Sequence, residues 1–199
     1  MQIGALTIAF DKLGLSPSSA LLLLFGSLFG SAINLPLFKI KAERPPITTI
    51  PQAIRGLLQK KMPTFNGKTL IAVNVGGCLM PLTFSIYLVS HNPIATHHVL
   101  LAIIIVAMIC YISSRPIPGL GIGMPIFIAP ISAALVAVII DPHYSPALAY
   151  VCGTLGVIIG ADLMRLKNIQ KMGTPIASIG GAGTFDGIFL TGVVAVLLA

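Results

Sequence analysis

Charged residues are scarce in this chain, and acidic residues are scarcer than basic ones. The 199 residues include 12 Lys and Arg but only 5 Asp and Glu, and charged residues make up 9% of the chain. A soluble domain carries about 25% charged residues. With 56% hydrophobic residues, the chain also has more apolar surface than a soluble core of this length can bury. The composition therefore predicts an all-α, polytopic membrane protein that forms a single domain over residues 1–199.

Cysteine is also sparse, and its three residues all lie in apolar runs and lack C-x-x-C spacing. Such cysteines are typical of packing positions, so we predict no disulfide framework, no metal site and no cofactor. The formal net charge of +7 would suit nucleic acid, but we predict no nucleic-acid partner. The positive-inside rule accounts for the same charges by their location in the loops of a membrane protein.

Long apolar runs are what the chain has in abundance. A membrane-spanning helix needs about 20 mostly apolar residues. Six segments meet or nearly meet this length, which predicts a bundle of about six spans: 18–38, 69–90, 97–114, 122–140, 146–164 and 174–198. The last is expected to be broken or irregular. Residues 1–15 are too short to span and contain Asp11 and Lys12, so we expect them to lie at the membrane interface.

Basic residues lie almost entirely on one side of these predicted spans. Eleven of the 12 lie in the links after the first, third and fifth spans, and only Lys12 lies on the other side. This bias predicts that these links are cytoplasmic and that both termini are outside. The basic link 39–68 contains a helical pattern over 51–61, which suits the anionic headgroups of membrane lipids.

All the histidines fall in the predicted outer loops, as His91, His97, His98 and His143, with Asp141 nearby. Their spacing does not place two ligands on one helical face, so we interpret them as solvated loop residues. The sequence does not assign them a role.

Two of the rare acids, Asp162 and Asp186, lie in strongly apolar, glycine-rich surroundings. An ionisable residue inside a membrane segment is costly and therefore indicates a functional site. Other spans carry polar or Gly/Pro elements that expose backbone if the helix breaks. We therefore predict further substrate- or ion-binding positions at Asn74, Gly76, Gly77, Pro118, Gly119, Gly121, Gly180, Gly181, Gly183 and Thr184.

Four of these stretches carry a family resemblance. The segments 72–77, 116–122, 160–163 and 180–190 resemble an uncharacterised prokaryotic membrane family, domain of unknown function 1614. The resemblance covers nearly the whole chain and implies a polytopic protein of the inner (plasma) membrane. It implies no particular activity.

A weaker resemblance is to presenilin-type intramembrane aspartyl proteases, which place one aspartate on each of two neighbouring helices. It implies that Asp162 and Asp186 are catalytic and that the substrate is a transmembrane peptide. Phe185 stands where the second protease motif has glycine, and Ala161 stands where the first has tyrosine.

Depth along the membrane decides whether the two aspartates can act together. In unbroken helices, Asp162 would lie roughly 5 Å and Asp186 roughly 18 Å from the inner boundary. A catalytic pair therefore requires residues 180–183 to be non-helical, with Thr184 capping a new helix.

Two other interpretations remain. Asp186 is the proton or ion site of a proton- or cation-coupled transporter or channel. Alternatively, Asp162 pairs with Arg115 or Arg165 while Asp186 caps a helix. The sequence leaves the oligomeric state open.

Overall fold

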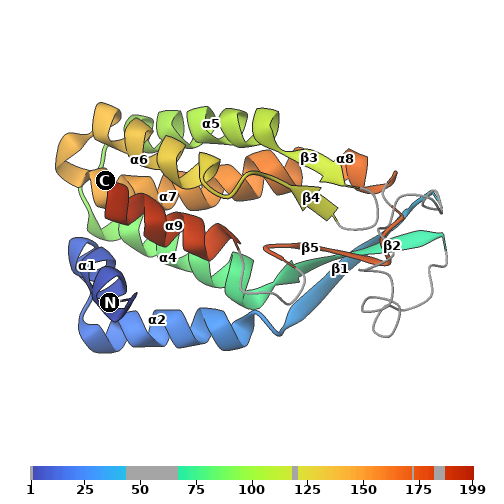
Figure 1. The fold of residues 1–199 in the computed structure, drawn as a ribbon, viewed down its shortest axis with the longest axis horizontal. Coiled ribbons are helices and arrows are strands. Elements are labelled where there is room, and N and C mark those ends of the chain that lie inside the picture. The colour runs from blue at the N-terminus through green and yellow to red at the C-terminus, as the bar shows by residue number, and fades with distance from the viewer. Residues whose placement is uncertain (1, 44–66, 118–120, 172, 182–186) are drawn as a thin grey trace.

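The computed structural model describes residues 2–43, 67–117, 121–171, 173–181 and 187–199. A bundle of helices occupies one end of the molecule, and β-strands gather at the other end (Figure 1). The α-helices are α1 (Gln2–Lys12), α2 (Pro17–Gly30), α4 (Met80–His91), α5 (Thr96–Ser113), α6 (Ile128–Ile140), α7 (Ser145–Val157), α8 (Leu166–Ile169) and α9 (Gly187–Leu198). Short turns of other helix types are η1 (Val75–Leu79), η2 (Pro142–Tyr144) and η3 (Ile158–Leu163).

Helix α7 lies at the centre of the bundle and contacts α4, α5, α6 and α9. Nearly all of its side chains are buried, including Leu148, Tyr150 and Val151. Small residues allow the neighbouring helices to approach closely: a Cβ on Gly153 would lie 3.1 Å from the Cβ of Ala133 in α6. In lipid, close backbone approach of this kind is a main source of helix association.

Three strands form a sheet in the order β1–β2–β5: β1 (Asn34–Lys41), β2 (Lys68–Asn74) and β5 (Ile176–Ile179). β1 runs antiparallel to β2, with a register shift between Pro36 and Phe38, and β2 runs parallel to β5. A second, two-stranded sheet pairs β3 (Arg115–Ile117) with β4 (Gly121–Gly123). The strands extend the molecule beyond the ends of the helices (Figure 1).

The predicted all-α fold is thus wrong in part: the protein is mostly helical but contains these sheets. Three predicted spans are divided between strand and helix. The span at 18–38 ends in β1, the span at 69–90 begins with β2, and the span at 174–198 begins with β5. The apolar run Leu70–Val73 is rich in residues that suit a buried strand as well as a helix, which explains the error.

Two helical segments among the described residues are long and apolar enough to cross a membrane, Thr96–Ser113 and Pro142–Leu163. They match the predicted spans 97–114 and 146–164, and they suggest a membrane protein. Four other helical segments are apolar but shorter: Pro17–Gly30, Val75–His91, Ile128–Ile140 and Ile188–Leu198. A bundle of six full-length spans is therefore not what the described residues form.

The N-terminal helix α1 packs against α9 and α2, with Ala9 and Phe10 buried. Both termini lie at the end of the molecule opposite the sheets (Figure 1). The predicted interfacial helix at 51–61 lies outside the described residues.

Candidate functional site

Asp162 lies at the end of the central helix, where α7 continues into the π-helical turn η3. Glycines at the end of this helix bring it close to α5. A Cβ on Gly156 would lie 2.6 Å from Val106, and one on Gly160 would overlap the carbonyl oxygen of Ala107. π-Helical turns are rare and often occur at functional sites. In this turn Asp162 is half-buried, and it follows the last regular turn of α7.

The carboxylate of Asp162 accepts a hydrogen bond from a glycine turn that follows β5. The backbone N–H of Gly180 donates to Oδ2 of Asp162 at 3.2 Å. Gly180 and Gly181 have φ angles of 84° and 92°, in the region that L-residues with a Cβ avoid. A Cβ on Gly180 would also lie 2.7 Å from the backbone nitrogen of Cys78, so crowding and conformation both require glycine here.

A second π-helical turn, η1, faces the same turn and contains Gly76 and Gly77. The side chain of Asn74 caps it: Oδ1 accepts a hydrogen bond of 2.7 Å from the N–H of Gly77. On the α2 side, Ser27 Oγ donates to the carbonyl oxygen of Gly76 at 2.7 Å, and a Cβ on Gly76 would collide with the Ser27 carbonyl. The glycine therefore lets η1 lie directly against α2.

Asn74 is fully buried, and its amide group joins three segments. Its Nδ2 donates to the carbonyl oxygen of Ser31 at 2.6 Å and to Oδ1 of Asn34 at 3.1 Å. Oδ1 of Asn34 also accepts a hydrogen bond of 2.6 Å from Ser178 Oγ in β5. A polar network thus crosses all three strands of the sheet and ends next to the glycine turn at Gly180.

Sequence reasoning identified Asn74 but missed Asn34, Ser178 and Ser27, its neighbours in this polar layer. Each is a single polar residue in or beside an apolar run, which was the available signal. Their partners lie far away along the chain, since Asn34 and Ser178 are 144 positions apart, so the network itself was not visible.

The structure brings part of the predicted site together. Asn74, Gly76 and Gly77 lie at the end of β2 and in η1, while Gly180 contacts both this segment and Asp162. Gly181 follows in the same turn. Gly121 lies in β4, in the separate two-stranded sheet. The remaining predicted residues lie outside the described part of the chain: Pro118, Gly119, Gly183, Thr184 and Asp186.

An unbroken helix over 174–198 is excluded, because strand β5 and the turn at Gly180–Gly181 occupy its first part. The described part of α9 begins at Gly187, immediately after Asp186. The depth difference expected for two unbroken helices therefore does not apply. The separation of Asp162 and Asp186 remains a prediction.

Arg165 is directed at the C-terminal end of α5. Its Nη2 donates to the carbonyl oxygens of Tyr111 and Ser114 at 2.7 and 2.9 Å, and its Nε donates to Ser114 Oγ at 3.2 Å. The guanidinium also lies 4.2 Å from the centre of the Tyr111 ring. Arg165 therefore caps α5, a role that differs from the ion pair with Asp162 considered above.

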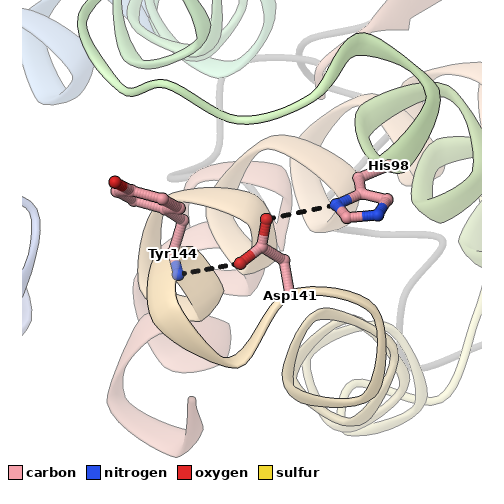
Figure 2. Close-up of polar contacts among 3 residues, drawn as sticks. All are labelled: His98, Asp141 and Tyr144. Atoms are coloured by element: carbon pink, nitrogen blue, oxygen red, sulfur yellow. Dashed lines mark hydrogen bonds and ion pairs between the residues drawn. The ribbon is translucent and has the colours of Figure 1, made fainter.

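The histidines that we predicted to lie in outer loops are at the opposite end of the bundle, and one of them contacts a carboxylate. Nδ1 of His98 lies 3.2 Å from Oδ2 of Asp141, while Oδ1 of Asp141 accepts a hydrogen bond of 3.3 Å from the N–H of Tyr144 (Figure 2). Asp141 thereby joins the start of α5 to the corner between α6 and α7. The described residues contain no group of three His, Cys, Asp or Glu side chains that could hold a metal ion.

No curated protein and no solved structure shows significant similarity to the chain. The sequence profile of one family, described as protein of unknown function (DUF1614), matches residues 28–198. This range includes the last three residues of α2, all elements from β1 to α9 and every predicted site residue. The chain therefore belongs to the DUF1614 family.

Proposed function

We propose that this protein is an intramembrane hydrolase that cleaves a peptide bond in a transmembrane substrate, using Asp162 and Asp186. The observation that carries the proposal is the hydrogen bond from Gly180 to Asp162. It ties the segment that leads to Asp186 to the carboxylate at the end of the central helix. The motif resemblance to presenilin-type proteases supports the same pair.

The surface of the helices supports a membrane setting for this chemistry. Large apolar side chains are exposed along several helices, including Leu22 in α2, Ile104 in α5 and Ile139 in α6. Only 28% of the span in α5 is buried inside the protein, which is typical of a helix that faces lipid. We therefore propose a multi-pass protein of the prokaryotic plasma membrane, with both termini outside and the basic strands at the cytoplasmic side.

The proposed reaction uses the two carboxylates in complementary protonation states. Two carboxylates in one site hold one proton between them, because two negative charges close together repel. The ionised group removes a proton from water as its oxygen attacks the peptide carbonyl carbon. The protonated group donates its proton to the carbonyl oxygen. When the C–N bond of the tetrahedral intermediate breaks, the amine nitrogen takes up the proton that came from water. One hydroxyl group of the intermediate returns its proton to the other carboxylate, so the products are a carboxylic acid and an amine and the pair again holds one proton.

In this proposal Asp162 is the group that removes the proton from water. The backbone N–H of Gly180 donates to its Oδ2 and so helps to hold the carboxylate in place. The surrounding turn is held by the capped η1 turn and the sheet, so its N–H is fixed before substrate binds. A fixed donor of this kind needs no reorganisation during the reaction.

Cleavage of a membrane-anchored peptide in proteoliposomes tests this function. The wild-type protein should cleave the peptide, whereas Asp162→Asn and Asp186→Asn should each abolish cleavage. Asp11→Asn is the matched control, because Asp11 is an exposed acid on α1 at the opposite end. Normal cleavage by both site variants would overturn the proposal.

A cation- or proton-coupled transporter is the second candidate, and one observation favours it. Irregular backbone from η1, η3 and the Gly180 turn converges beside Asp162, an arrangement that transporters use to bind ions between broken helices. The same proteoliposomes distinguish the two functions. Ion or proton flux that requires Asp186, without peptide cleavage, would favour the transporter.

A further inference from the structure

The end of the molecule that carries the sheet has an exposed cluster of lysines, which we call the basic end. It consists of Lys39 and Lys41 in β1, Lys68 in β2, Lys167 in α8 and Lys171 after it. Among the described residues, the only ion pair is His98 with Asp141 at the opposite end, so these lysines have no acidic partner there. Within the part of the chain that the structure describes, their charges are not compensated by an ion pair.

The same strand that supplies two of these lysines also exposes large apolar side chains. Leu37 and Phe38 have exposed fractions of 55% and 51%, and Lys39 and Lys41 follow immediately. The strand thus changes from apolar to basic along its length. This pattern suits the boundary between acyl chains and headgroups, where apolar side chains enter the lipid and lysines reach the phosphates.

An open cavity of about 110 Å³ lies between the sheet and α8. Phe38, Ile40, Ile71 and Leu166 give it an apolar lining, and Lys167 and Gln170 add an ammonium and an amide group. Glu43 fixes this arrangement through its backbone N–H, which donates to the carbonyl oxygen of Gln170 at 2.8 Å. The cavity therefore combines an apolar lining with hydrogen-bond donors suited to a phosphate.

We propose that the basic end binds an anionic phospholipid of the surrounding bilayer. The phosphate contacts Lys167 and Gln170, and the adjoining part of the lipid lies against Phe38 and Ile40 in the cavity. The remaining lysines attract the negative headgroups around it. This proposal uses residues other than Asp162 and Asp186, and it stands independently of the proposed hydrolase activity.

The test measures thermal unfolding of the full chain in neutral detergent. Dioleoyl phosphatidylglycerol should raise the unfolding temperature more than dioleoyl phosphatidylcholine does, and inorganic phosphate at the same concentration should have little effect. The difference between the two lipids should decrease as salt increases. In the triple variant Lys39→Gln, Lys41→Gln, Lys167→Gln, apparent affinity for the anionic lipid should fall roughly fivefold per lysine.

Lys12→Gln provides the matched control, because it removes one positive charge at the opposite end. It should leave the difference between the two lipids unchanged. Equal stabilisation by both lipids, or an undiminished difference in the triple variant, would overturn the proposal. Equal stabilisation by inorganic phosphate would also overturn it, since that result would assign the site to free phosphate and not to lipid.

Discussion

The backbone N–H of Gly180 donates a hydrogen bond of 3.2 Å to Oδ2 of Asp162. This contact joins the turn after β5 to the end of the central helix α7. It depends on a glycine, because the turn has a positive φ angle and lies directly against Cys78.

Replacing Gly180 with alanine should destabilise the protein by about 2–4 kcal/mol, combining left-handed strain with overpacking. Gly14→Ala is the matched control, since Gly14 has a φ of 69° but, apart from its two chain neighbours, no atom within 4 Å of the position that a Cβ would take. This variant should lose stability through backbone strain alone, by about 1–2 kcal/mol. Thermal unfolding of both variants in one detergent measures the difference. Equal losses would show that crowding against Cys78 contributes nothing.

Removal of the Asn74 side chain should be among the most damaging polar substitutions in the protein. Asn74→Ala leaves the N–H of Gly77 and the carbonyl of Ser31 without their partner in a buried position. The expected loss is about 2–4 kcal/mol, because each buried unsatisfied group costs about 1–3 kcal/mol. Asn34→Ala removes an exposed side chain of the same network and should cost about 1 kcal/mol. Urea unfolding of the two variants measures both losses of stability. A larger loss for Asn34→Ala than for Asn74→Ala would contradict the prediction.

The contact between α5 and α7 supplies a third prediction. Gly160→Ala places a methyl group against the backbone of Ala107 and should cost at least about 2 kcal/mol, as overpacking against rigid backbone does. Gly26→Ala meets only the flexible end of Met80, at 2.7 Å, and should cost less than about 1 kcal/mol. Thermal unfolding of the pair decides whether α7 and α5 are as closely packed as the structure indicates. Similar losses in the two variants would count against it.

Replacing Arg165 with lysine should destabilise the protein, although the positive charge is kept. Arg165→Lys loses the forked contacts with Tyr111 and Ser114 and the stacking on the Tyr111 ring. A loss of about 1–3 kcal/mol is expected from these charge-assisted bonds. Arg115→Lys, at an exposed position, should change stability by less than about 0.5 kcal/mol. An unchanged unfolding temperature for Arg165→Lys would refute the capping role.

The sequence predicted the long helices well and the sheet not at all. Thr96–Ser113 and Pro142–Leu163 are apolar over at least 18 residues, and that length is itself a strong signal. The strands are short apolar runs, for which length and composition do not separate strand from helix. Their pairing was also invisible, because Leu70 and its parallel partner Ile176 are far apart in the chain.

Only part of the candidate site was predicted from the sequence, again because some of its contacts join distant segments. Local chemistry was sufficient for the glycine turn, since adjacent Gly180 and Gly181 weaken a helix. Asp162 was identified because an acid in an apolar segment is costly. The contacts with Asn34 and Ser178 depend on how three distant strands assemble, and no local pattern encodes that arrangement.

The account depends most on Asp162 and Asp186 forming a single site, and thiol cross-linking tests this directly. In a background without the native cysteines, Asp162→Cys, Asp186→Cys should be joined by a short bifunctional maleimide in membranes. Asn34→Cys, Ser178→Cys is the positive control, because these side chains lie 2.6 Å apart. The negative control is the double variant Asp11→Cys, Asp162→Cys. Its two cysteines lie at opposite ends of the molecule and should not be cross-linked. Efficient linkage of the aspartate positions is the predicted result. Linkage of the positive control without linkage of the aspartate positions would contradict the account.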